Sequence, residues 1–420
     1  MLQKLKLPFF RTGILLLGTG FMYQQVTPFF LSVGSILLGL SSLLPPYHFR
    51  ANRYAWIILL IWVMNLLSGL WSENIHDWLQ VIVRQLALIL IPLAALNPPD
   101  KTGNSFFKKA HLYWISLAAV FAIISLFRYL LYKNNIDLAL LESGAIPIWD
   151  GKSWPWHLTA ISSSKFQESG INHIYFSLIQ AVALFYCGFA WSKSKKAIWL
   201  VLGIIHLITI HWFLARTGII GLYFGLLILM LWHWRRSKSN KYVWIGLGFC
   251  LIIPLVSYFS FEAVRNKVKN SMEDLQAIHG DRSINHRSLA MRVEAWKTAW
   301  HILKKHPMGV GLGDADQAMA QQYNEDESML WLENRIPPHN QYLEIAIASG
   351  WPNALLLLSL LIGGILDYWR KPRLLKLAIY SCFLVALCFE SILQTQLGIC
   401  LFPFFLLFVN EMGEPKAPEQ

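Results

Sequence analysis

Residues Ile198 to Trp234 read IWLVLGIIHLITIHWFLARTGIIGLYFGLLILMLWHW, two apolar runs that meet at Arg216. Each run approaches 20 residues, which is the length that crosses the hydrocarbon core of a bilayer as an α-helix. We therefore expect two membrane-spanning helices, beginning near Ile198 and Thr217, with a guanidinium group at their junction.

The composition of the whole chain extends this pattern. Of its 420 residues, 55% are hydrophobic and only 14% are charged, whereas a soluble domain carries about a quarter charged residues. Many of the nineteen Trp residues lie near the ends of apolar runs, as in the aromatic belts of membrane proteins. The chain is predicted to be an all-α integral membrane protein in contact with membrane lipids.

About twelve membrane spans are predicted from the apolar runs. They begin near Thr12, Val26, Tyr54, Leu79, Leu112, Ile171, Ile198, Thr217, Tyr242, Gln341, Leu377 and Ile392.

Lys and Arg residues follow the even-numbered spans in short loops. The loops after spans two, four, six, eight and ten contain Arg50 and Arg53; Lys101, Lys108 and Lys109; Lys193, Lys195 and Lys196; Arg235, Arg236, Lys238 and Lys241; and Arg370, Lys371, Arg373 and Lys376. The alternate turn from Trp71 to Asp77 contains no Lys or Arg. Because cytoplasmic loops carry the excess of Lys and Arg, we expect both termini in the cytoplasm.

This topology predicts four regions. Residues 1–260 hold spans one to nine, with an outer loop near 133–170. Residues 261–340 form a large outer loop with an amphipathic helix, residues 341–410 hold spans ten to twelve, and residues 411–420 are a cytoplasmic tail.

The net charge of +12 is not read as a sign of nucleic-acid binding, because the basic residues are dispersed among short inter-helix loops. Part of the excess suits anionic lipid head groups or phosphates. The five Cys residues lie in apolar runs and match no zinc or redox spacing, so they are interpreted as packing residues. No cofactor is predicted.

The large outer loop contains the predicted amphipathic helix, from Arg287 to Lys305. Leu289, Val293, Trp296, Trp300 and Leu303 fall on one face at helical spacing, which suits the membrane interface. The pattern ends at His306-Pro307 and at the glycine-rich run Gly309 to Gly313. No strand precedes this run and no Walker lysine follows it, so it is predicted to be a turn rather than a nucleotide-binding loop.

Three side chains, Arg216, Arg292 and His339, are candidates for a functional site. Arg216 lies close to hydrocarbon with no carboxylate adjacent in sequence, so it either snorkels to the interface or binds an anion such as phosphate. Arg292 is either a solvated charge on the amphipathic helix or a clamp on a phosphorylated lipid, a task that suits its planar fork.

His339 follows Pro337 and Pro338 and precedes an apolar helix. Its imidazole either contacts its own helix or acts as a base, and the adjacent helix N-terminus favours an anion nearby. A site formed by His339 and the two arginines would need no metal ion, and a metal-dependent site is the alternative. Asp281, Asp314 and Asp316 are available, but no third ligand is spaced to complete a known site.

Three segments carry a resemblance to a known family: Arg216-Thr217-Gly218, Met291 to Gly311, and Pro338 through Gly350. They resemble the O-antigen ligase family, whose superfamily also includes O-antigen polymerases and O-linked protein oligosaccharyltransferases. His339, Asn340 and, after nine intervening residues, Gly350 fit the ligase pattern, whereas Asn353 stands where the family has Gly, Thr or Tyr.

The resemblance implies a GT-C-like glycosyltransferase in the bacterial inner membrane with a periplasmic active site. Its donor would be a glycan on undecaprenyl diphosphate, and its acceptor the lipid A–core oligosaccharide or another glycan. In that family His339 would be the catalytic base and Arg216 and Arg292 would bind the diphosphate. Arg287 would be a further diphosphate-binding candidate and Asn340 a candidate orienting residue. The reaction would invert the anomeric centre.

Other functions stay open at this point. An O-antigen polymerase is the nearest alternative, but its Arg-and-Gly spacing occurs here only as Arg235 and Gly246, in a loop predicted to be cytoplasmic. A protein oligosaccharyltransferase often carries an additional C-terminal domain. A transporter or flippase is also considered, although the unusual polar residues cluster at one membrane face rather than at the midplane.

Overall fold

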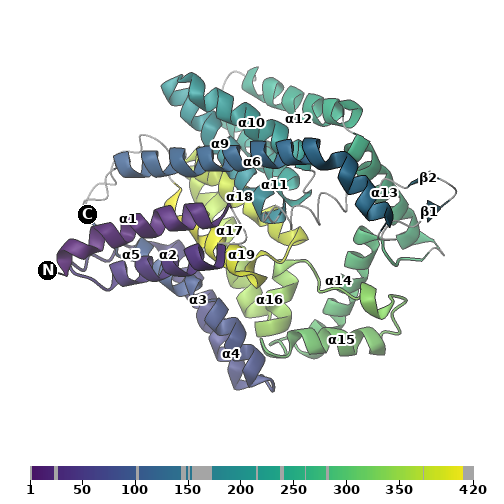
Figure 1. The fold of residues 1–420 in the computed structure, drawn as a ribbon. Helices are drawn as coiled ribbons and strands as arrows, with labels where there is room; N and C mark the ends of the chain where they lie inside the picture. The colour runs from purple at the N-terminus through teal and green to yellow at the C-terminus, as the bar shows by residue number, and fades with distance from the viewer. Residues whose placement is uncertain are drawn as a thin grey trace.

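The computed structural model describes residues 2–22, 27–100, 104–142, 148–149, 152–153, 173–213, 216–236, 241–260, 262–280, 283–371 and 373–409. Helices dominate these residues (Figure 1). The first half of the chain contains α1 (Gln3–Gly20), α2 (Thr27–Ser42), α3 (Arg53–Leu67), η1 (Ser68–Leu70), α4 (Ile75–Arg84), α5 (Ala87–Leu96), α6 (Asn104–Glu142), β1 (Ile148–Trp149), β2 (Lys152–Ser153), α9 (His173–Ser194) and α10 (Ala197–Phe213). The two short strands pair antiparallel.

The second half continues with helices only, among the residues described. These are α11 (Arg216–Arg236), α12 (Lys241–Ser260), α13 (Glu262–His279), α14 (Ser288–Lys305), α15 (Ala315–Glu325), η3 (Leu332–Asn334), α16 (Gln341–Ser349), α17 (Trp351–Arg370), α18 (Leu374–Phe389), η4 (Ile392–Gln394) and α19 (Gln396–Phe408).

The chain is a helical membrane protein, as its composition predicts. Among the described residues, seven helical segments are long and apolar enough to cross a bilayer, and four shorter apolar helices accompany them. Each of the twelve predicted spans corresponds to a helix or a pair of helices. However, α1 is neither among the seven long apolar segments nor among the four shorter apolar helices. The count of twelve, and the GT-C-like architecture, therefore stay predictions.

The predicted tenth span is divided in two. The chain turns at Gly350, whose φ of +87° separates the nine residues of α16 from α17. Only α17 is among the candidate spans, so α16 lies outside them.

The core of the molecule centres on α18. This helix packs against α9, α11, α16, α17 and α19, and most of its side chains are buried. Because α18 packs against these five helices, its last turn at Phe389 and the residues that follow are held in a defined position beside α16.

The large loop lies at the end of the molecule away from the N-terminus, where Figure 1 shows α13, α14 and α15 together. The predicted helix from Arg287 to Lys305 is confirmed as α14. Its face buried inside the protein consists of Ala290, Ala295, Thr298, Ala299, Ile302 and Leu303, and only Leu303 belongs also to the apolar face predicted for the membrane interface. Trp300 is 48% exposed and contacts Trp351 edge to face. Small residues let α14 pack closely onto α13, α15 and α16.

The glycine-rich run after α14 is a turn, as predicted. Gly309 and Gly311 have φ values of +82° and +106°, which glycine adopts without steric cost. The amide of Val310 donates to the carbonyl of Ile347 at 2.8 Å, and that of Gly311 to Ala348 at 3.1 Å. These amides satisfy the last carbonyls of α16, so they are not directed at a phosphate.

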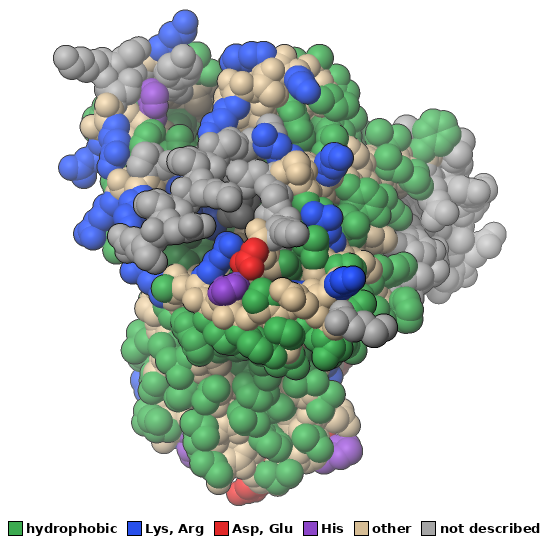
Figure 2. All heavy atoms as spheres, turned by 90° about the vertical axis from the view of Figure 1, so that its left-hand side faces the viewer, with side chains coloured by type: hydrophobic (Ala, Val, Ile, Leu, Met, Phe, Trp, Pro, Cys, Tyr) green, Lys and Arg blue, Asp and Glu red, His purple; other side chains and the backbone are tan. Residues whose placement is uncertain are grey.

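On the side of the molecule that bears the N-terminus, basic side chains gather over the upper half of the view in Figure 2, whereas the lower half is mostly hydrophobic. The helix ends and loops with Arg50, Lys108, Lys196, Arg236 and Lys371 are all exposed. Beyond the predicted boundary at Lys133, α6 continues to Glu142. The rest of the predicted outer loop, apart from β1 and β2, and the tail 411–420 lie outside the described residues.

Candidate active site

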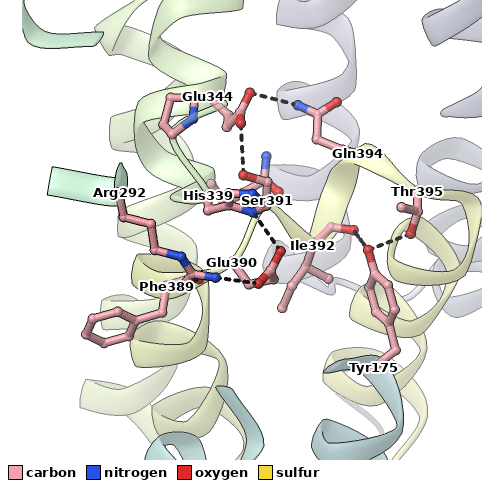
Figure 3. A network of polar contacts seen from close by, with 12 residues as sticks. Tyr175, Arg292, His339, Glu344, Phe389, Glu390, Ser391, Ile392, Gln394 and Thr395 are labelled. Atoms are coloured by element: carbon pink, nitrogen blue, oxygen red, sulfur yellow. Dashed lines mark hydrogen bonds and ion pairs between the residues drawn. The ribbon is translucent and has the colours of Figure 1, made fainter. Parts of the chain in front are cut away.

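A carboxylate links two of the three candidate side chains. The Nδ1 atom of His339 lies 3.1 Å from Oε1 of Glu390, and the other carboxylate oxygen, Oε2, lies 3.5 Å from Nη2 of Arg292. Figure 3 shows the two residues on either side of Glu390. The side chain of Glu390 is only 9% exposed, whereas those of Arg292 and His339 are 20% and 31% exposed. The carboxylate is therefore buried, whereas the imidazole and the guanidinium are partly accessible to solvent.

Glu390 is positioned by the break between α18 and α19. Phe389 ends α18, and its carbonyl, which has no partner within the helix, accepts a hydrogen bond of 2.8 Å from Nη1 of Arg292. The cation thus also complements the negative end of the α18 dipole. Beyond Glu390, the amide of Leu393 donates to Oε1 of Gln341 at 2.6 Å, which ties this connection to α16.

The approach to His339 is held by a second set of contacts. The indole Nε1 of Trp296 on α14 donates to the carbonyl of Pro338 at 2.7 Å. The hydroxyl of Tyr323 on α15 donates to the carbonyl of Ile336 at 2.8 Å. Trp296, predicted to face the membrane interface, is instead bonded to the histidine segment.

His339 itself has a φ of +47°, a left-handed conformation that costs a non-glycine residue roughly 1–3 kcal/mol. Strained residues of this kind persist where the surrounding contacts determine them and concentrate at functional sites. In this conformation the imidazole lies against Glu390.

Asn340 has a local role. Its side-chain oxygen accepts hydrogen bonds from the amides of Tyr342 and Leu343, at 3.0 and 3.2 Å, which is the geometry of a helix N-cap. Asn340 therefore starts α16 directly after His339, and no hydrogen bond joins the two side chains within the part of the chain described.

Arg216 lies at the first turn of α11, next to the large loop. Its Nη2 donates to Oγ of Ser271 on α13 at 3.2 Å. It is close enough to Asp274 for attraction and to Arg292 for like-charge repulsion. The neighbouring sequence contains no carboxylate, but folding brings Asp274 near. The two candidate arginines therefore face a common region from α11 and α14.

Arg287, the further candidate, is committed to α13. Its Nη1 lies 3.9 Å from Glu273 and 4.0 Å from Asp274, and its Nε donates to the carbonyl of Ser283 at 3.0 Å. Asp274 also accepts from the amide of Leu289 at 2.9 Å, so it caps α14 from a distance. The side chain of Arg287 is 26% exposed, so it stays a candidate beside Arg292.

A second carboxylate lies behind the site. Glu344 on α16 accepts hydrogen bonds from Oγ of Ser391 at 3.0 Å and Nε2 of Gln394 at 3.4 Å (Figure 3). Burial raises the pKa of Glu344 to about 7, although the hydrogen bond from Ser391 opposes this shift. Glu344 and Glu390 are thus adjacent carboxylates in different settings.

The acidic residues considered for metal binding lie elsewhere. Asp314 accepts hydrogen bonds from Oγ of Ser72 and from the amides of Glu73 and Asn74, at 2.7 to 2.9 Å. It docks the turn after η1 onto the large loop. Asp316 is exposed, and Asp281 lies outside the described residues.

The geometry places an imidazole and a guanidinium group on one carboxylate, an arrangement that could supply a base and an anion site. The carboxylate of Glu390 accepts from Nδ1–H of His339, so Nε2 carries the lone pair that can accept a proton. Sequence reasoning missed Glu390. A carboxylate inside an apolar run is the signal that would have found it.

Comparison with known families matches residues 201–359 to the family described as O-antigen ligase. The matched segment contains Arg216, Arg292 and His339 and ends before Glu390. A comparison with curated proteins found no match.

Proposed function

We propose that this chain, whose residues 201–359 match the family described as O-antigen ligase, transfers a glycan from undecaprenyl diphosphate to the lipid A–core oligosaccharide. The reaction inverts the anomeric centre and needs no metal ion. It runs at the periplasmic face of the bacterial inner membrane, with both termini and the basic side of Figure 2 in the cytoplasm.

Arg216 and Arg292 bind the diphosphate in this proposal. A guanidinium has five N–H groups. Arg216 gives one to Ser271 and Arg292 uses two for Phe389 and Glu390, which leaves donors for phosphate oxygens. As the bond from the sugar C1 to phosphate oxygen breaks, negative charge grows on the leaving group. Fixed donors stabilise that charge, and one such contact is worth about 3–4 kcal/mol.

His339 removes the proton from the acceptor hydroxyl. Its Nε2 takes the proton as the hydroxyl oxygen bonds to C1 from the side opposite the leaving phosphate. The imidazolium that forms is stabilised by Glu390, which also holds the ring in one tautomer. The products are the new glycoside, undecaprenyl diphosphate and a proton on His339 that passes to water.

One observation carries this proposal: Glu390 contacts both His339 and Arg292. It supports a base and a leaving-group site within one rigid unit, which catalysis by positioning requires.

The test is transfer by purified protein in nanodiscs from a lipid-linked glycan to a lipid A–core acceptor. His339→Ala should lower kcat by roughly 10²–10⁴-fold, while His301→Ala, at an exposed His on α14, should leave it unchanged. Full activity in His339→Ala would end the proposal.

Deletion in the native cell separates a ligase from a polymerase. Loss of a ligase leaves polymerised glycan on its lipid carrier, whereas loss of a polymerase leaves single repeats on the cell surface. The second outcome would replace the acceptor proposed here with a second lipid-linked glycan.

A further inference from the structure

A second recess lies on the large loop, away from His339. It is a pocket of about 500 Å³ between the C-terminal end of α14, α15 and the turn after η1. Pockets that hold small ligands fall in this range of volumes. None of its lining residues belongs to the Arg216, Arg292 and His339 group.

The lining combines one aromatic ring with planar polar groups. Trp71 lies on one wall and is 37% exposed. Gln317 and Gln321 come from α15, and Lys305 and His306 from the end of α14. An indole offers a flat apolar face, and each amide offers a donor and an acceptor. Sugar rings present an apolar C–H face and adjacent hydroxyls, which match these groups.

The charges of the lining exclude a simple anion site. Lys305 pairs with Glu325 and donates to Gln322 at 2.9 Å. Glu73 and Asp314 add further negative charge, and Asp314 is already hydrogen-bonded to the turn. One lysine thus stands against three carboxylates in the lining, and a neutral, hydroxyl-rich ligand fits better than a phosphate.

Two of the polar groups are free to bind. Gln317 and Gln321 are exposed, and their side chains make no hydrogen bond to another residue in the described ranges. Since α15 is fixed by Tyr323, which bonds the carbonyl of Ile336, these amides are presented from a rigid support. Little ordering is needed when a ligand binds them.

The pocket is within reach of the candidate active site. Ile302 lines the pocket and lies ten residues from Arg292 on the same helix, which is about 15 Å at the helical rise. Turn residues Gly309 and Val310 line it too, and Val310 bonds the last turn of α16, the helix that begins after His339. A few linked sugars span this separation.

We propose that this pocket is a subsite for neutral sugar rings of a glycan substrate, separated from the reacting sugar by a few residues of the oligosaccharide. This inference rests on the proposed function. Binding energy gained there on non-reacting sugars would favour long glycans over short ones.

The experiment compares donors that carry one sugar and donors that carry several repeats. In Gln317→Ala/Gln321→Ala, the ratio of KM for the long donor to KM for the one-sugar donor should rise about tenfold, as two lost hydrogen bonds imply. Trp71→Ala should raise the same ratio. Ala320→Gln, at an exposed position of α15 outside the lining, should not change it.

The acceptor is varied in the same way, from a full to a truncated core oligosaccharide. A length-dependent effect on the acceptor KM alone assigns the pocket to the acceptor glycan and supports the subsite. No effect on either ratio, or equal effects on long and short substrates, overturns it.

A binding measurement separates this inference from the proposed function. The soluble glycan released from the donor by mild acid is titrated by calorimetry into the His339→Ala protein, whose pocket is intact. Binding that is weakened about tenfold by Gln317→Ala/Gln321→Ala supports the subsite even if wild-type protein transfers no glycan. Absence of binding in the His339→Ala protein contradicts the subsite alone.

Discussion

His339 and Glu390 are joined by a contact of 3.1 Å between Nδ1 and Oε1, although 51 residues separate them in the chain. One residue precedes α16 and the other follows α18, two helices that pack together. The pair fixes which ring nitrogen carries the proton, because a carboxylate only accepts. The proposed role of His339 as a base therefore depends on the packing of α16 against α18.

Glu390→Gln should lower kcat by roughly 10²-fold while leaving the donor KM and the thermal unfolding midpoint nearly unchanged. The amide still accepts from Nδ1–H but carries no charge to stabilise the imidazolium. Steady-state kinetics check this split, and Glu333→Gln, at an exposed position, is the matched control. Unchanged kcat in Glu390→Gln would show that the carboxylate has no part in proton transfer.

The Glu390→Gln change should add little to the loss caused by His339→Ala. Residues that act as one unit have non-additive effects, so the double variant should be about as active as His339→Ala alone. Multiplied losses would mean that the two residues act independently.

Arg292→Lys should lower kcat/KM by roughly 10²-fold, because lysine keeps the charge but loses the planar fork. The variant also loses the geometry of the bond to the Phe389 carbonyl. Lys297→Ala removes an exposed cation from the same helix and serves as the control in the same transfer assay. Equal activities of Arg292→Lys and wild type would assign Arg292 to packing alone.

Sequence reasoning reaches the membrane class and the approximate positions of the helices, since apolar runs and basic loops act locally. It also proposes Arg216, Arg292 and His339 as site residues, because their residue types suit the proposed chemistry. It does not reach Glu390, because its partners lie 51 and 98 residues away. For the same reason, the sequence does not reveal that Asp274 lies near Arg216, because Asp274 belongs to another helix.

The packing face of α14 was not predicted, for a related reason. Hydrophobic spacing places the large residues Val293, Trp296 and Trp300 on the face that suits the membrane interface, whereas the face buried inside the protein includes Ala295 and Ala299. Close approach of helices favours small side chains, and a pattern based on hydrophobicity alone gives them little weight.

Gly350→Ala should destabilise the protein by about 1–3 kcal/mol. The residue has a φ of +87°, and a Cβ there would lie 2.8 Å from the carbonyl carbon of Met308. Gly363→Ala is the matched control, because a Cβ at this position in α17 meets nothing within 4 Å and alanine favours a helix by about 1 kcal/mol. Thermal unfolding in detergent should therefore shift in opposite directions for the two variants. A shift in the same direction would contradict the strained turn.

The stability of the protein should depend on pH through Glu344. Burial raises the pKa of its carboxyl from 4.5 to about 7 in the folded chain, so the folded state holds a proton that the unfolded state releases. The contribution to stability is complete below pH 4.5 and is lost as the pH rises to about 7. The two pKa values differ by about 2.5, and each pH unit between them is worth about 1.4 kcal/mol. The free energy of unfolding should therefore be lower by about 3 kcal/mol at pH 8 than below pH 4.5.

Glu344→Gln removes this titration and keeps a group that can accept from Ser391. The variant should be more stable than wild type at pH 8, and the difference should shrink as the pH is lowered to 5. Unfolding midpoints measured across that range check the prediction, with Glu333→Gln as the control for a loss of one exposed carboxylate. If wild type and Glu344→Gln lose stability in parallel between pH 5 and 8, Glu344 is not the group that titrates.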